Sequence, residues 1–267
     1  MRQKPRLVRG FCRGGRAPGG GQDNFAFDKV ERLPGNIGYE KFRLFAYSYL
    51  AAATASSATD FVTNTDALII DLRENGGSDP AMVVQLASYR FDTRAHLHEI
   101  VTRKGGVTEQ AWTTPGLPGQ AFGGSKPVCL LNSQQTFSAA EDVAYALQAL
   151  ARATVVDEST SGGAPPSHSF KIGDQVVAVV PYVRSVSPIT HGNWEGSGVI
   201  PDVAVPAAQA QQTAYRLSVQ ALIARAANEG EAAGLRALLE DPASSCVAVA
   251  PASKLHDQKQ RTCRSAH

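Results

Sequence analysis

The chain has 267 residues, of which 43% are apolar and 19% are charged, the composition of a globular protein that can bury a core. The formal net charge of +2 is uneven, because six Lys and Arg residues precede the first acidic residue, Asp23. The remainder carries 20 basic and 24 acidic residues, so it lacks the basic stripe of nucleic-acid-binding proteins. No window approaches eighteen uninterrupted apolar residues, which excludes a membrane-spanning helix.

The two ends of the chain differ in composition from its middle. Residues 1–22 are basic and Gly-rich without the apolar stretch of a secretory signal, and we expect a disordered leader. Residues 23–242 are expected to form one α/β domain, and residues 243–267, which show no period, a loose tail. The cysteines have no close pairing, so neither a zinc site nor a disulfide framework is indicated and the compartment stays open: Cys12, Cys129, Cys246 and Cys263.

The first half of the middle section contains a strand pair and then a strand–turn–helix unit. Residues 25–45 alternate on both sides of the turn Pro34–Gly35–Asn36 and predict two antiparallel strands. The stretch "YLAAATASSATDFVTNT" starts with helical spacing and then loses it. "ALIIDLR" is a continuous apolar run typical of a strand covered on both faces; the turn "ENGGSDP" and the helical "AMVVQLASYRF" follow it.

A second unit repeats this order. "PVCLLNS" predicts a strand, "QQTF" a turn and "SAAEDVAYALQALA" a helix, after which "TVVDE" predicts a third buried strand. Such alternation implies an α/β domain with a mainly parallel sheet flanked by helices. Further on, "FKIGDQVVAVVPYVRSVSP" predicts a strand pair, and residues 207–240 predict two helices separated near Asn228 and Gly230.

Candidate chemistry lies where two predicted strands end, because ligands of open α/β sheets bind at the carboxyl ends of the strands. Ser138 begins a predicted helix, where unpaired N–H groups and the positive end of the helix dipole can stabilise an oxyanion. Backbone amides of the Gly76–Gly77 turn and of Ala139 would supply the donors. The alternative is a helix cap, since Ser138 and Glu141 match the capping-box spacing S-x-x-E.

Three ordered blocks, "ALIIDLRENGGS", "TFSAAEDVAYALQALARATVVDESTSGGA" and "GNWEGSGVIPDVAV", resemble the tail-specific (carboxyl-terminal processing) serine peptidase family. Within it, they and "NFAFDKVERLPGNIGYEKFRLF" are most similar to the branch of interphotoreceptor retinoid-binding protein modules and the tricorn protease core. The resemblance covers roughly residues 23–240 and implies a ClpP/crotonase-like core with Ser138 as the nucleophile. It also implies that the N-terminal helical part of the family is absent from this chain.

The sequence departs from the family pattern at the general base. Gly163 stands where the tail-specific branch carries a lysine, and residues 1–22 contain no histidine to match the upstream base of the tricorn-like branch. The resemblance places Glu195 of "NWEG" at that branch's late glutamate, either as an orienting acid or as a loop brace. The remaining candidate bases are the other histidines: His96, His98, His168, His191, and His256 and His267 in the tail.

The resemblance therefore implies a serine endopeptidase that acts on peptide or unfolded polypeptide and is weak or inert alone. The different-class alternative is a non-catalytic module that binds an apolar ligand or a peptide, as the missing base would allow. Acyl-CoA chemistry on a crotonase-like fold is a third reading, for which no adenine-nucleotide site is recognisable. No cofactor or metal is implied, an oligomer is compatible with the family, and the localisation stays unknown although relatives are often exported.

Overall fold

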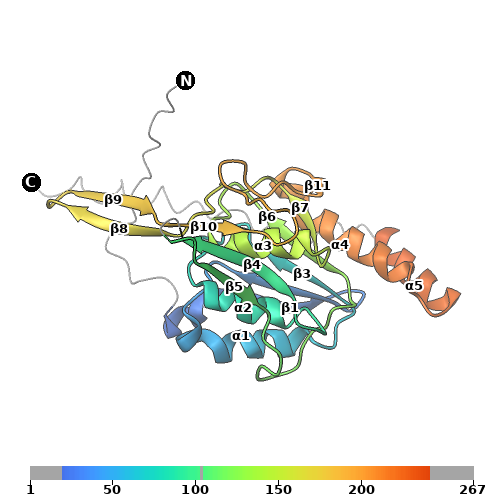
Figure 1. Ribbon diagram of the computed structural model, residues 1–267. Coiled ribbons are helices and arrows are strands. Elements are labelled where there is room, and N and C mark those ends of the chain that lie inside the picture. Colours follow the sequence, from blue (N-terminus) through green and yellow to red (C-terminus); the bar gives the residue numbers. More distant parts are fainter. Residues whose placement is uncertain (1–19, 103–104, 241–267) are drawn as a thin grey trace, which may run out of the picture.

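The computed structural model describes residues 20–102 and 105–240 as a layered α/β domain with one projecting arm (Figure 1). The predicted tail and all but the last three residues of the predicted leader lie outside the described residues. No helix in the described part of the chain is long and apolar enough to cross a membrane.

The centre of the domain is a six-stranded sheet in the order β1-β2-β3-β6-β7-β11. Strand β1 is antiparallel to β2, and every other neighbouring pair is parallel, so the predicted mainly parallel sheet is confirmed. All residues of β3 and β6 are buried, as expected of strands covered on both faces. The strands are β1 (Phe27–Leu33), β2 (Ile37–Phe42), β3 (Ala67–Asp71), β6 (Val128–Asn132), β7 (Thr154–Asp157) and β11 (Val203–Ala204).

Helices cover the two faces of this sheet unequally. On one face, the strand side chains that point to that face are covered by three helices: α1 (Ser48–Val62), α2 (Pro80–Ser88) and α3 (Ala139–Ala149). On the other face, α4 (Ala207–Ile223) packs on the opposite phase, while α5 (Glu229–Glu240) buries little beyond Ala232. Helix α1 continues to its end without the expected loss of pattern, because its buried face consists largely of alanines.

A second, three-stranded antiparallel sheet lies against α3, in the order β10 (Val183–Val186), β4 (His96–Thr102) and β5 (Thr108–Trp112). The predicted strand pair near residue 175 consists of β8 (Ser167–Ile172) and β9 (Val176–Pro181), which bond only to each other as a two-stranded ribbon. Figure 1 shows this ribbon extending away from the body, from a base that leads directly into β10.

Candidate active site

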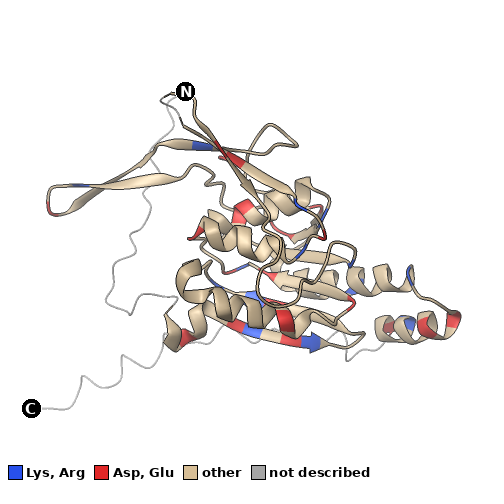
Figure 2. Ribbon diagram, turned by 60° about the horizontal axis from the view of Figure 1, so that its bottom comes forward, with Lys and Arg blue, Asp and Glu red and all other residues tan. Residues whose placement is uncertain are grey.

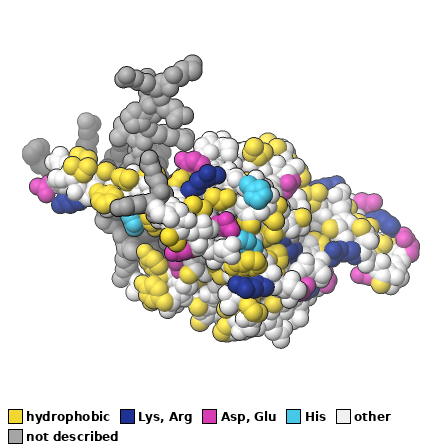
Figure 3. Space-filling model, viewed as in Figure 1, with side chains coloured by type: hydrophobic (Ala, Val, Ile, Leu, Met, Phe, Trp, Pro, Cys, Tyr) yellow, Lys and Arg dark blue, Asp and Glu magenta, His cyan; other side chains and the backbone are white. Residues whose placement is uncertain are grey.

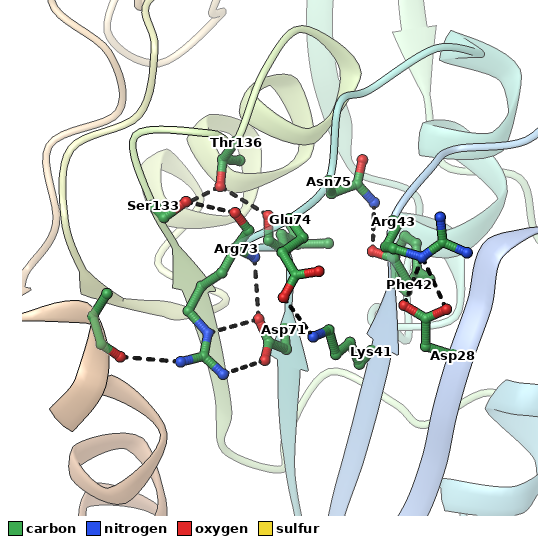
Figure 4. A network of polar contacts seen from close by, with 12 residues as sticks. Asp28, Lys41, Phe42, Arg43, Asp71, Arg73, Glu74, Asn75, Ser133 and Thr136 are labelled. Atoms are coloured by element: carbon green, nitrogen blue, oxygen red, sulfur yellow. Dashed lines mark hydrogen bonds and ion pairs between the residues drawn. The ribbon is translucent and has the colours of Figure 1, made fainter. Parts of the chain in front are cut away.

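The turn after β3 is fixed by a buried ion pair. Arg73 donates from Nε and Nη2 to the two oxygens of Asp71, and from Nη1 to the carbonyl of Ala207 at the start of α4 (Figure 4). Burial alone would raise the pKa of Asp71, but these bonds from Arg73 outweigh burial and lower it. This ion pair thus holds the turn to the helix on the far face of the sheet.

Asn75 connects the same turn to the loop that carries Ser138. Its side chain donates to the Phe42 carbonyl and accepts from the Gly77 N–H, each at 2.9 Å, and its own carbonyl accepts from the Phe137 N–H at 3.0 Å. The side chain is completely buried. Asn75 therefore sets the distance between the two loops that leave β3 and β6.

Ser138 has a backbone conformation that an ordinary helix cap does not need. Its φ of 57° and ψ of −119° lie in a region that non-glycine residues rarely adopt, whereas N-cap residues usually have extended dihedrals. The Ser138 hydroxyl faces the Glu141 N–H and the Glu141 carboxylate accepts from the Ser138 N–H, so both halves of a capping box are present in spite of this conformation. Such strain persists only where neighbouring groups hold it in place.

Glu141 is the group that holds this turn. Its buried carboxylate accepts hydrogen bonds from the Ser138 N–H at 2.8 Å and from the Thr160 hydroxyl at 2.6 Å. It also accepts from the N–H groups of Gly162, at 2.6 Å, and Gly163, at 3.0 Å. One carboxylate thus joins the first turn of α3 to the Gly-rich loop after β7.

The three predicted oxyanion residues lie together, but their amides differ in availability. A Cβ on Gly77 would lie 2.5 Å from the Phe137 carbonyl oxygen and 2.7 Å from the Ala139 nitrogen, so only glycine allows this approach. The Gly76 N–H donates to the Arg43 carbonyl and the Gly77 N–H to Asn75 Oδ1. The Ala139 N–H has no partner among the described residues.

Position 163, where the resemblance to the family implies a lysine, is filled by the Phe137 ring. A Cβ on Gly163 would overlap the ring of Phe137, the residue before Ser138. The ring is partly exposed and lies over the backbone of the Gly-rich loop. A lysine at position 163 would therefore require the Phe137 ring to move first.

Glu195 lies on the next segment of the same loop system. Its carboxylate accepts a hydrogen bond from the Ala164 N–H at 2.9 Å. Ala164 directly follows the two glycines whose N–H groups bond to Glu141, so the two carboxylates bind three successive backbone amides. This hydrogen bond braces the loop. The Glu195 side chain also borders an open pocket of about 610 Å³. The walls of this pocket are mainly apolar and include Val101, Pro165, Pro181, Tyr182 and Val183.

The described histidines differ in burial and in the groups that they contact. His98 is buried on β4 with Nδ1 3.0 Å from the Asp142 carboxylate, one turn along α3 from Ser138. Burial alone would lower the pKa of His98, but the Asp142 charge outweighs burial and raises it. His96 stacks on Trp112, His168 stacks on Tyr182 beside the pocket, and His191 is exposed on the turn before Glu195. His256 and His267 lie outside the described residues.

Sequence reasoning did not assign the supporting roles of Asn75, Glu141 and Thr160. Glu141 was considered only as half of a capping box, and its three further donors come from residues about twenty positions later. Two adjacent glycines after a buried strand were the available signal, because a glycine-rich loop offers amides to a buried anion. Trp194 is buried in the core.

Three comparisons relate this geometry to known proteins. The model of peptidase family S41 matches residues 35–205. The carboxyl-terminal-processing peptidase 2 of Arabidopsis thaliana chloroplasts is 29% identical over 180 residues, which cover 65% of this chain and 34% of that protein. The carboxyl-terminal-processing protease of Picosynechococcus is 26% identical over 184 residues, 68% of this chain and 42% of that protein.

Among solved structures, the photosystem II D1 C-terminal processing protease superposes with a TM-score of 0.52 at 24% identity. The superposition covers 65% of this chain and 44% of that one, and it shows the shared fold. The chain spans between a third and a half of the length of each of these relatives.

Proposed function

This chain belongs to peptidase family S41, and we propose on that premise that it is a serine-type peptidase core in which Ser138 is the nucleophile. Ser138 Oγ would attack the carbonyl carbon of a peptide bond, and the carbonyl oxygen would become an oxyanion. The C–N bond would then break, the serine proton would pass to the leaving amine, and an acyl-enzyme would remain. The observation that carries the proposal is the strained backbone of Ser138 at the start of α3.

The strain favours a nucleophile over a cap. A conformation of this kind costs on the order of 1–3 kcal/mol, which a cap in extended conformation avoids. The Glu141 carboxylate holds Ser138 against this cost through the Ser138 N–H and three donors of the Gly-rich loop. A sharp turn between strand and helix projects a serine side chain outward, as nucleophilic serines require.

Oxyanion stabilisation is assigned to the amides around Gly77. The Ala139 N–H is the first donor, because it is at the helix N-terminus and has no partner among the described residues. The Gly77 N–H is the second and would be shared with Asn75 Oδ1. Gly76, whose N–H is bonded to the Arg43 carbonyl, would shape the turn rather than donate.

Glu195 and the pocket that it borders are assigned to the substrate side of the site. Glu195 would fix the loop that follows Gly163 and present its second oxygen to the pocket. The substrate class proposed is peptide or unfolded polypeptide, as in the relatives named carboxyl-terminal-processing peptidases. With glycine at position 163, the Ser138 hydroxyl lacks the lysine of the family pattern, so we expect slow acylation.

A fluorophosphonate probe tests the nucleophile, because a strong electrophile reacts even with a weakly activated serine. We expect slow labelling of one residue, Ser138, located by mass spectrometry of peptides and abolished in Ser138→Ala. Ser133→Ala is the matched control, since Ser133 follows the same strand but lies five residues before the strained Ser138. Labelling at another residue, or none after long exposure, would overturn the proposal.

The second candidate is a module that binds an apolar ligand, and the apolar pocket beside Glu195 favours it. A saturable titration with an environment-sensitive aliphatic fluorophore, weakened by Val183→Asp, together with an unreactive Ser138, would select this function. Labelling of Ser138 together with no saturable binding would reject it.

A further inference from the structure

The ribbon β8–β9 exposes apolar side chains although nothing in the described part of the chain covers them. Valines 176, 177, 179 and 180 are each between 46% and 62% exposed, and Phe170 and Ile172 are 53% and 59% exposed. Figure 3 shows hydrophobic side chains along the projecting arm. An isolated two-stranded ribbon is marginally stable in water, and an apolar surface of this kind usually marks an interaction site.

The register divides the ribbon into two unlike faces. Residues opposite each other in an antiparallel pair share a face. One face, named here the apolar face, is formed by the pairs His168–Val180, Phe170–Ala178 and Ile172–Val176. The other face is mixed and consists of Ser167–Pro181, Ser169–Val179 and Lys171–Val177.

Charge narrows the choice of partner for the apolar face. The charged residues of the ribbon are Lys171 and Asp174, which pair with each other at 3.3 Å near the tip (Figure 2). An anionic membrane is attracted by clusters of basic residues, and the ribbon has none. A strongly charged protein partner would likewise find no complementary charge on this face.

We propose that the apolar face is an interface with a second copy of this chain, the two arms packing face to face about a two-fold axis. A copy of the same ribbon has an equally uncharged and apolar face, and a two-fold axis makes such a surface complementary to itself. The arm extends away from the body, so a second arm can reach it (Figure 1).

The size of the face predicts a weak dimer. Half-exposed side chains on the apolar face provide roughly 400 Å² per copy, below the roughly 800 Å² per partner of a stable interface. We therefore expect a reversible dimer whose population rises with protein concentration. This interface is independent of Ser138, but the base of the arm at Pro181 and Tyr182 forms walls of the pocket beside Glu195.

Sedimentation velocity over a range of concentrations tests the interface. The double variant Phe170→Asp/Val180→Asp, on the apolar face, should raise the dimer Kd at least tenfold. The control Val177→Asp/Val179→Asp changes equally exposed residues of the mixed face and should alter it less than threefold. A wild-type chain that stays monomeric at all concentrations, or equal effects of both doubles, would overturn the proposal.

Disulfide cross-linking provides a second readout that needs no disruptive charge. With Cys12, Cys246 and Cys263 changed to serine, Ala178→Cys on the apolar face should give an oxidised dimer, and Val179→Cys on the mixed face should not. Cosedimentation with neutral and anionic phospholipid vesicles tests whether the apolar face binds lipid instead of a second copy of the chain. Vesicle binding that the Phe170→Asp/Val180→Asp double abolishes, from a chain that is monomeric in solution, would assign the face to lipid instead.

Discussion

Two carboxylates at the same edge of the sheet are both fully buried, yet their surroundings are opposite. Glu141 accepts four hydrogen bonds from the Ser138 turn and the Gly-rich loop. Asp157, the last residue of β7, has no hydrogen bond to either oxygen among the described residues, and Arg73 Nε is 4.0 Å away. Asp157 also has a φ of 117°, which favours glycine.

The difference shows that burial alone does not decide what a carboxylate does to a fold. Donors arranged around Glu141 replace the water that it loses, so its charge can fasten a strained turn. Asp157 loses the same water without replacement, and burial raises its pKa to about 7. One carboxylate therefore stabilises the site, and the other costs stability wherever it is ionised.

The largest expected effect comes from Glu141→Gln, which disrupts the hydrogen bonds around the Glu141 carboxylate. The amide replaces one acceptor by a donor that faces other donors, so we expect a loss of about 3 kcal/mol in the free energy of unfolding. Labelling of Ser138 by the fluorophosphonate should also slow. Urea denaturation measures the first effect, with Glu74→Gln in an exposed ion pair as the control. An equally stable Glu141→Gln variant would contradict the assigned role.

Asp157→Asn should have the opposite effect and raise the free energy of unfolding. Because the folded pKa is above the unfolded value of 3.8, the folded state binds more protons between these values, and stability falls as pH rises through the window. The asparagine variant should gain about 2 kcal/mol at roughly pH 8 and almost nothing near pH 4. Urea midpoints measured across pH give the result. An increment that is the same at both pH values would show that ionisation is not the cause.

The smallest expected effect concerns the pair His98–Asp142, which joins β4 to α3. The folded pKa of His98 is raised, so its contribution is complete below the unfolded pKa and is lost as pH rises through the folded pKa. Asp142→Asn should cost about 1 kcal/mol near pH 5.5 and little near pH 9. His96→Gln, on the same strand but stacked on Trp112, is the control. A loss that does not depend on pH would point to packing instead.

Most of the central sheet could be predicted from sequence because its strands are short apolar runs bounded by turns. "ALIIDLR" and "PVCLLNS" predicted β3 and β6, and the split of residues 207–240 into α4 and α5 was also found. The second sheet was not predicted as a unit. Strand β5 is half-exposed and weakly patterned, and the pairing of β10 with β4 joins residues about eighty positions apart, which no local pattern encodes.

For the site, the ends of two predicted strands located Ser138 and the Gly76–Gly77 turn, and the resemblance to a family added Glu195; all of them remain predictions until reactivity is measured. Spacing alone favoured a cap, and the capping-box arrangement does occur, with Glu141 bonded to the Ser138 N–H. The positive φ of Ser138 could not be read from sequence, because it results from contacts with residues that follow β7. The lack of hydrogen bonds to the Asp157 carboxylate among the described residues likewise depends on how three strand ends meet.

The Gly-rich loop that serves Glu141 is itself held by the last loop before β11. The Gly196 N–H donates to the Gly162 carbonyl, and the Val199 N–H donates to the same Thr160 hydroxyl that donates to Glu141. A ribosome releases Ser138 well before it releases Val199. In a nascent chain, the hydrogen bonds that hold the Gly-rich loop beside the Ser138 turn are therefore incomplete until residues 196–199 have been made and folded. Any reactivity of Ser138 should then begin only in the completed domain.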